Sequence, residues 1–140
     1  MLRQANVSDI PAMHRVRLSV RENRLTSTAI SEADYLSGIT DCGRGWVVEF
    51  EGVVVGFAIA NGRTGNIWAL FVDPQHEGKG YGRQLHDTMT EWAWSQGLER
   101  LWLTTSGHTR AQGFYLAAGW KDIGRTENGE VQFELLRPQP

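Results

Sequence analysis

The residues best suited to chemistry in this sequence are a run of alternating glycines and polar residues: Gly78, Lys79, Gly80, Tyr81, Gly82 and Arg83. The run follows an apolar segment, residues 66–72, that is typical of a buried strand and that Pro74 ends. Apolar residues then recur at the spacing of one helix face, which predicts a helix over about residues 80–96. The first amides of a helix have no partner within the helix, and glycines let a phosphate approach them closely. The sequence therefore predicts a phosphate site at this turn.

The segments on either side of the turn must hold it in place. Upstream, residues 46–50 and 53–60 flank a two-residue turn and predict a hairpin that continues into residues 66–72 as an antiparallel meander. Downstream, residues 101–105 predict a strand that pairs in parallel with residues 66–72 through a right-handed crossover. The other expected elements are a strand at 1–5, helices from Ser8 to near residues 22–23, from Ser31 past Ile39 and at 109–118, and a last hairpin with its turn at Asn128 and Gly129 and its second strand at 131–136.

The first helix has a recognisable start and an apolar stripe. Ser8 or Asp9 is expected to cap it, and a proline is tolerated in its first turn. The apolar stripe is formed by Ile10, Met13, Val16, Leu18 and Val20. The arginines of this segment, Arg15, Arg17 and Arg21, are expected on the wetter faces.

Composition limits the classes of protein that the sequence can encode. The chain has 140 residues, which predicts a single domain over residues 1–140. Its formal charge of -2 gives no electrostatic indication of nucleic acid or an anionic membrane as a partner. An 18-residue apolar run and a signal-peptide pattern are both lacking, so we expect a cytoplasmic protein. Cys42 is the single cysteine, which predicts neither an internal disulfide nor a metal site.

Two motifs resemble those of the GNAT superfamily of acetyl-CoA-dependent N-acetyltransferases. The first is Q/R-x-x-G-x-G/A preceded by an apolar strand and V-x-P, and it is matched by Val72, Pro74, Gly80 and Gly82, with Glu77 at the Q/R position. The second is A-x-x-F-Y-x-x-x-G-F, matched by Ala111, Phe114, Tyr115, Gly119 and Trp120. The resemblance implies an α+β fold with a mixed, mostly antiparallel central sheet of about six to seven strands and about four helices.

The resemblance also implies a set of site residues. Acetyl-CoA is the expected cosubstrate and no metal is expected. The implied cofactor-binding residues are Phe71, Val72, Gly78, Lys79, Gly80, Tyr81, Gly82 and Arg83, with backbone groups of Phe71 and Val72 beside the pantetheine arm. Tyr115 is placed beside the sulfur, and its hydroxyl stays protonated at neutral pH, so it can protonate the leaving thiolate. Position 108 often carries asparagine in the family, and here it is His108.

The general base is left open between Glu22, His76 and His108, because Asn66, Trp68 and Leu70 place no carboxylate on the central strand. His108 is expected at the start of the helix that carries Tyr115, where the helix dipole disfavours an imidazolium, so we interpret it as a second catalytic candidate. Mid-helix positions suggest packing or surface roles for His14 and His86. Trp46 and Trp68 are candidates for the wall of an acceptor pocket.

The function that this reasoning favours is direct transfer of the acetyl group of acetyl-CoA to an amine of a small molecule or peptide. No side chain stands out as a nucleophile for a covalent intermediate. Two other hypotheses remain: a non-catalytic CoA- or nucleotide-binding regulatory module, and an interaction protein whose aromatic residues form a subunit interface. A homodimer is compatible with each of these.

Overall fold

The computed structural model describes residues 1–20, 32–105 and 110–138, which form two antiparallel sheets covered by helices. Within these residues the elements are β1 Leu2–Gln4, η1 Val7–Asp9, α1 Ile10–Ser19, α3 Glu32–Thr40, β2 Gly43–Phe50, β3 Val53–Asn61, β4 Ile67–Val72, η3 Pro74–His76, α4 Tyr81–Ser95, β5 Arg100–Thr105, α5 Arg110–Ala117, β6 Lys121–Arg125 and β7 Val131–Leu136. Each expected strand and helix is present within a few residues of its predicted bounds. The α+β class is therefore confirmed.

The first sheet has the order β1-β2-β3-β4 and contains the predicted meander. Glu51 and Gly52 both have positive φ angles, 53° and 79°, as the tight turn between β2 and β3 requires. Two register shifts interrupt the ladders, one between Val48 and Glu49 and the other between Ile59 and Ala60. The second shift lies opposite Trp68, where one residue of β4 is skipped in the pairing.

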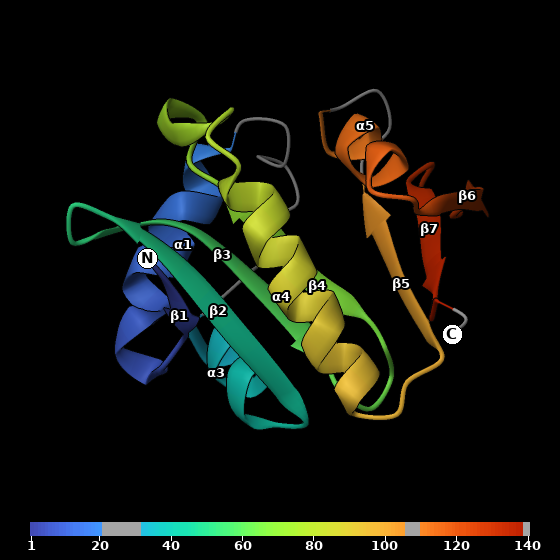
Figure 1. The fold of residues 1–140 in the computed structure, drawn as a ribbon, viewed down its shortest axis with the longest axis horizontal. Helices are drawn as coiled ribbons and strands as arrows, with labels where there is room; N and C mark the ends of the chain where they lie inside the picture. The colour runs from blue at the N-terminus through green and yellow to red at the C-terminus, as the bar shows by residue number, and fades with distance from the viewer. Residues whose placement is uncertain (21–31, 106–109, 139–140) are drawn as a thin grey trace.

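The second sheet has the order β5-β7-β6, and among the described residues one bridge joins it to the first sheet. It is a parallel bridge between Asn66 and Trp102, beside a hydrogen bond from the Trp102 amide to the Gly65 carbonyl at 3.0 Å. From this bridge β4 and β5 diverge, as Figure 1 shows. The predicted parallel pairing is thus confirmed at a single bridge, and the expected central sheet is divided into four-stranded and three-stranded parts. Within the described ranges, the edge of β4 that faces β5 has no strand partner beyond the bridge.

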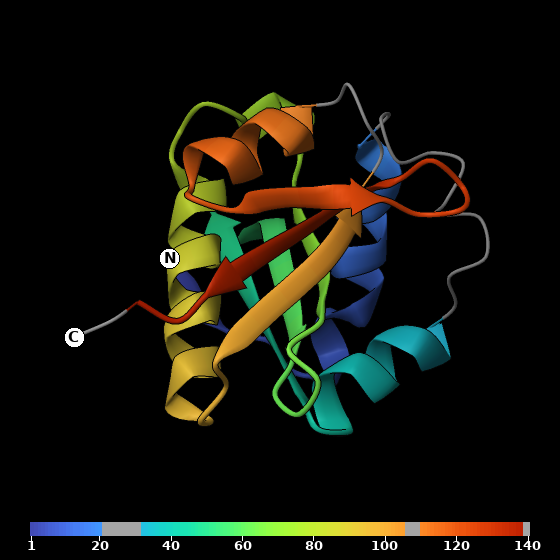
Figure 2. The ribbon, with the colours of Figure 1, turned by 90° about the vertical axis from the view of Figure 1, so that its right-hand side faces the viewer.

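Helices cover both faces of the four-stranded sheet. Figure 2 shows α4 on one side of it and α1 on the other. One core cluster lies between the sheet and α4 and includes Leu85, Met89 and Trp46. Another lies between the sheet and helices α1 and α3 and includes Met13, Val16 and Tyr35. The sheet therefore separates two apolar layers. A ligand bound at the edge of β4 would be next to both layers.

The start of α1 differs from the expected cap. Asn6 caps the 3-10 turn η1 that precedes α1: its Oδ1 accepts from the Ser8 amide at 3.0 Å, and the Asp9 carboxylate accepts from the Asn6 amide at 2.9 Å. Asp9, one of the two residues predicted to cap the helix, holds the N-cap position of α1, but its side chain makes no capping hydrogen bond to α1 because a short 3-10 turn precedes the helix and the carboxylate accepts from the Asn6 amide. Asp9 is buried there and accepts two hydrogen bonds from Arg3, at 2.8 and 2.9 Å.

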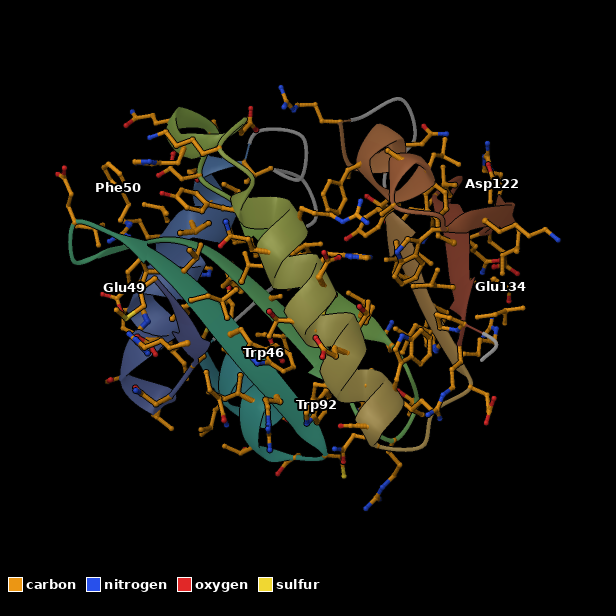
Figure 3. The ribbon with its side chains drawn as sticks, viewed as in Figure 1. Trp46, Glu49, Phe50, Trp92, Asp122 and Glu134 are labelled. Carbon is orange, nitrogen blue, oxygen red and sulfur yellow. The ribbon has the colours of Figure 1, made fainter. Side chains whose placement is uncertain are left out.

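Trp46 also takes a different place from the expected one. Its side chain is buried and meets Trp92 of α4 edge to face, with ring centroids 5.4 Å apart, and Figure 3 shows the two side chains between β2 and α4. Trp46 therefore belongs to the core rather than to an acceptor pocket, because it projects from the face of β2 that α4 covers.

Candidate active site

A cavity of about 720 Å³ lies between the diverging strands β4 and β5. Its lining comes from β4, the turn between β4 and α4, the end of β5, helix α5, the end of α1 and the turn between β6 and β7. Among the residues predicted from the sequence, the lining includes Phe71, Val72, Gly78, Gly80, Tyr81, Gly82, Arg83 and Tyr115. Residues far apart in the chain are brought together here because β4 has no strand partner on this side.

The edge of β4 that faces the cavity has free peptide groups. The Asp73 amide donates to the Val55 carbonyl at 2.8 Å, and Phe71 is paired with Phe57 in the same register. Hydrogen-bonding residues alternate along an antiparallel strand, so the peptide groups of Phe71 point to β3 and those of Leu70 and Val72 point the other way. The backbone contact predicted for Val72 is available, Leu70 offers another, and Phe71 contributes its side chain to the cavity.

The glycine turn meets the cavity with open backbone. Gly78 and Gly80 have φ angles of 77° and 85°, in the left-handed region that glycine adopts without strain. A Cβ placed on Gly78 would meet no atom within 4 Å, and on Gly80 the nearest atom is Gln84 Nε2 at 4.0 Å. Gly80 precedes α4 without giving it a side-chain cap. The glycines are thus required by the backbone conformation and leave space above the helix start, which suits a phosphate.

Charged side chains surround this turn. The Glu77 carboxylate lies 3.2 Å from Arg110 Nη1, so the residue at the family's Q/R position pairs with the start of α5. Arg83 Nε lies 3.0 Å from the Asp87 carboxylate, one helical turn away. The Lys79 ammonium lies over the Phe50 ring, 4.4 Å from its centroid, and Lys79 is not part of the cavity lining. Its predicted phosphate contact stays a prediction that requires the side chain to move.

Tyr115 lies in the cavity wall with its ring in the core. Its ring packs against Trp120 and Phe133, with centroids 5.4 and 5.8 Å away, and the residue is buried. Burial raises the pKa of the Tyr115 hydroxyl well above its ordinary value, so the hydroxyl keeps its proton at neutral pH. The state expected of a proton donor is therefore present. His108, the other catalytic candidate, lies outside the described residues.

His86 has the packing role expected from its place in α4. Its Nε2 accepts a hydrogen bond from the Trp120 indole at 2.9 Å, and its Nδ1 lies 2.8 Å from the Asp87 carboxylate. Burial lowers the pKa of His86 below 6.5, although the neighbouring Asp87 acts in the opposite direction. The neutral imidazole links α4 to Trp120, which lies three residues after the end of α5.

Sequence reasoning missed Arg17 as a residue of the cavity. It was expected on a wetter face, and this is wrong: it is 7% exposed and lines the cavity next to Val20. Its guanidinium stacks over Phe71 and Trp68, at 4.9 and 5.5 Å from the ring centroids. A signal was present, since position 17 comes four residues after the buried Met13 and shares its helix face. Trp68 lines the cavity, and its role in the wall of an acceptor pocket stays a prediction.

The candidate bases fall into two groups. Of those predicted, His76 lines the cavity, while Glu22 and His108 lie outside the described residues. Glu130, in the turn between β6 and β7, is a half-buried carboxylate that also lines the cavity and was missed. The turn that carries it lies far from β4 in the sequence, and only the tertiary structure brings the two together. In the described ranges, no group of three or more His, Cys, Asp or Glu side chains could hold a metal ion.

Comparison with known families agrees with this geometry. The model of the acetyltransferase (GNAT) family matches residues 11–120 of the 140. This chain belongs to the GNAT acetyltransferase family. The resemblance found in the two motifs is thereby confirmed, and with it acyl transfer as the chemistry of the family. Among curated proteins, none matches this GNAT chain significantly.

Solved structures share its fold over nearly the whole length. A PaiA N-acetyltransferase from Thermoplasma acidophilum in complex with coenzyme A aligns with a TM-score of 0.83 at 13% identity and covers 98% of each chain. An aminoglycoside 6'-N-acetyltransferase complexed with coenzyme A has a TM-score of 0.80 at 16% identity, over 100% of this chain and 99% of the other. The ribosomal-protein-S18-alanine N-acetyltransferase from Escherichia coli has a TM-score of 0.76 at 19% identity, over 96% and 90%. These identities are low, so the likeness is one of fold.

The acceptors named for these structures are chemically diverse, and the fold therefore does not select one for this GNAT chain. As for membranes, none of the helices in the described residues is both long and apolar enough to cross a bilayer.

Proposed function

We propose that this GNAT chain transfers the acetyl group of acetyl-CoA directly to an amine of a small molecule or peptide. The observation that carries the proposal is the cavity, which joins the open start of α4, the free edge of β4 and the Tyr115 side chain in one space. Phosphate binding, alignment of an extended chain and proton donation are what a CoA thioester requires of a protein, and each is offered by a different part of this wall.

The residues present fit acetyl-CoA. Backbone amides at the glycine turn, where no Cβ covers the helix start, hold the pyrophosphate together with Arg83. The peptide groups of Leu70 and Val72 on the free edge of β4 pair with the pantetheine arm as a strand would. Glu77 holds Arg110 beside the same opening. Lys79 reaches the phosphates if it leaves the Phe50 ring.

The chain's own groups then serve the transfer. The amine nitrogen bonds to the acetyl carbonyl carbon, the carbon–sulfur bond breaks, and its electron pair stays on sulfur. Tyr115 donates its hydroxyl proton to that sulfur, and solvent restores the proton afterwards. The same apolar surroundings that raise the pKa of Tyr115 also raise the proton affinity of a thiolate placed there, so the transfer stays feasible. The amine's proton passes to water or to a base such as His76 or Glu130.

A matched pair of glycine variants tests the placement of the phosphates. Gly80 and Gly97 lie just before and just after α4, with φ angles of 85° and 88°, and neither has an atom closer than 4.0 Å to its added Cβ. Replacement by alanine should therefore strain both sites alike, by about 1–2 kcal/mol. We expect Gly80→Ala to weaken CoA binding about tenfold or more in calorimetry and Gly97→Ala to leave it unchanged. Equal affinities in the two variants would contradict the placement.

Turnover separates an enzyme from a binding module. The purified protein is incubated with acetyl-CoA and a panel of amines, and free thiol is measured. Amine-dependent thiol release supports the proposed transfer. Saturable CoA binding without thiol release from any amine would instead favour the non-catalytic CoA- or nucleotide-binding module.

A further inference from the structure

Arg17 is a buried charge whose donors are largely unused. It is 7% exposed, and its Nε and Nη1 atoms are buried and have no hydrogen-bond partner among the residues that the structure describes. Within residues 1–20, 32–105 and 110–138, no carboxylate forms an ion pair with it. Burial lowers the pKa of Arg17, but a guanidinium remains charged at neutral pH. An unpaired charge in a protein interior destabilises the fold. The burial of Arg17 is therefore not explained by a contribution to stability.

The surroundings of Arg17 hold its guanidinium in one place. The Phe71 and Trp68 rings lie 4.9 and 5.5 Å from it, which stabilises the cation without using its N–H donors. Tyr35, which lies next to Trp68, keeps its own hydroxyl engaged with His14 Nδ1 at 2.8 Å. The guanidinium fork is thus pre-oriented on an aromatic platform in the cavity wall, with donors left for a ligand.

Arg17 lies on the acceptor side of the cavity. Phe71 and Trp68 pack with the α1 and α3 layer, whereas the glycine turn leads into α4 on the opposite face of the sheet. Figure 2 shows these helices on opposite sides of the four-stranded sheet. A cofactor held by phosphate at the start of α4 approaches the edge of β4 from one face. The other face, where Arg17 lies, is then open to the second substrate.

We propose that Arg17 binds a carboxylate of the acceptor, so that the acceptor is an amine that also carries a carboxylate group. The proposal rests on the acetyl transfer proposed above and specifies its substrate class. A planar carboxylate accepts two parallel hydrogen bonds from one edge of a guanidinium, formed by Nη2 together with either Nε or Nη1, and each of the two unused donors of Arg17 lies on such an edge. A cationic acceptor without an anionic group, such as a polyamine, would meet an unpaired positive charge in the wall.

Paired acceptors test the proposal directly. Alanine, leucine, phenylalanine and gamma-aminobutyrate are each compared with the amine that lacks the carboxylate, namely ethylamine, isopentylamine, phenethylamine and propylamine. We expect the preferred carboxylated acceptor to exceed its partner in kcat/KM by roughly 10- to 100-fold, because its carboxylate satisfies the buried donors. Arg17→Met keeps a side chain of similar length on the Phe71 and Trp68 rings and should reduce that ratio to about one.

Arg15→Met is the matched control. Arg15 is exposed on the same helix, donates to the Val54 carbonyl and does not line the cavity. This variant should keep the wild-type preference. Decarboxylated amines that equal or exceed their carboxylated partners in the wild type would overturn the proposal, as would a preference that survives Arg17→Met.

Calorimetry distinguishes a failure of this proposal from a failure of acetyl transfer. Carboxylated and decarboxylated ligands are titrated into the wild type and Arg17→Met in the presence of CoA, with no turnover required. We expect at least one carboxylated ligand to bind the wild type and to lose affinity about tenfold or more in the variant. Absence of carboxylate-dependent binding overturns the proposal even if amines are acetylated. A CoA affinity that falls in Arg17→Met also overturns it, because Arg17 would then hold a phosphate of the cofactor.

Discussion

The two ends of helix α1 each bury a charged side chain, and they do so in opposite ways. At the first end, the Asp9 carboxylate accepts hydrogen bonds from Arg3 at 2.8 and 2.9 Å and from the Asn6 amide at 2.9 Å. At the other end, Arg17 Nε and Nη1 have no hydrogen-bond partner in the described part of the chain. Both residues are less than one-tenth exposed, so the difference lies in pairing and not in burial.

The comparison separates residues that hold the fold from residues that serve the cavity. Asp9 and His86 use their polar atoms within the protein. Arg17 and Tyr115 line the cavity, and Arg17 Nε and Nη1 have no hydrogen-bond partner among the described residues. Substitution of the first kind should change stability, and substitution of the second kind should change binding or rate.

Tyr115→Phe is expected to give the largest effect and to fall wholly on the rate. The variant keeps the ring that packs on Trp120 and Phe133 and deletes the hydroxyl. Turnover at saturating substrates should fall about 10²- to 10⁴-fold, the usual range for a lost proton donor. The midpoint of urea unfolding and the CoA affinity, measured as controls, should change little. Near-normal turnover would show that the leaving thiolate needs no proton from Tyr115, provided that chemistry limits the rate.

Asp9→Ala is expected to act on stability alone. It removes the partner of Arg3 and the acceptor of the Asn6 amide, which should lower the free energy of unfolding by about 2–3 kcal/mol. Hydrogen bonds from Arg3 lower the pKa of Asp9, so its contribution is complete above about pH 4 and is lost as the pH falls through that lowered pKa. The difference in stability between wild type and variant, measured by urea titration, should therefore shrink below pH 4.

The matched comparison at the other end of the helix is Arg17→Met. Removal of an unpaired buried charge should leave the free energy of unfolding unchanged or raise it. If Arg17→Met destabilises the protein as much as Asp9→Ala does, Arg17 stabilises the folded state. The two ends of the helix then do not differ in this respect.

His86→Gln is expected to give the smallest effect, seen as a change in pH dependence. Burial lowers the pKa of His86, so below pH 6.5 the unfolded chain takes up a proton that the folded chain does not. The free energy of unfolding therefore decreases as the pH is lowered. One such group contributes a slope of at most about 1.4 kcal/mol per pH unit. Glutamine can still accept from the Trp120 indole but does not titrate, so the slope between pH 6.5 and 5 should flatten. A slope that is the same in His86→Gln would assign the titration to another group.

Much of the fold was predictable because its signals are local. The turn at Glu51 and Gly52, the stop at Pro74 and the apolar spacing of Leu85 and Met89 each act over a few residues, and the corresponding elements have nearly the expected bounds. The sequence left the cap of α1 open between Ser8 and Asp9, since both are good caps; Asp9 takes the position, but its carboxylate bonds to Arg3 and to the Asn6 amide instead of to α1.

The residues of the candidate site also fall into those that local sequence signals predicted and those that only the tertiary structure placed. The sequence by itself determined the glycine turn, the strand before it and the place of Tyr115 in a helix, since each belongs to a short motif that is recognised from its spacing, and all three line the cavity. Tertiary structure alone decided that β4 and β5 part after the bridge at Asn66, because strand pairing depends on contacts between distant segments. It also decided that Glu130 reaches the cavity and that Arg17 lies buried on Phe71 and Trp68. A helix position shows which residues share a face, but what covers that face is set by the packing of the whole chain.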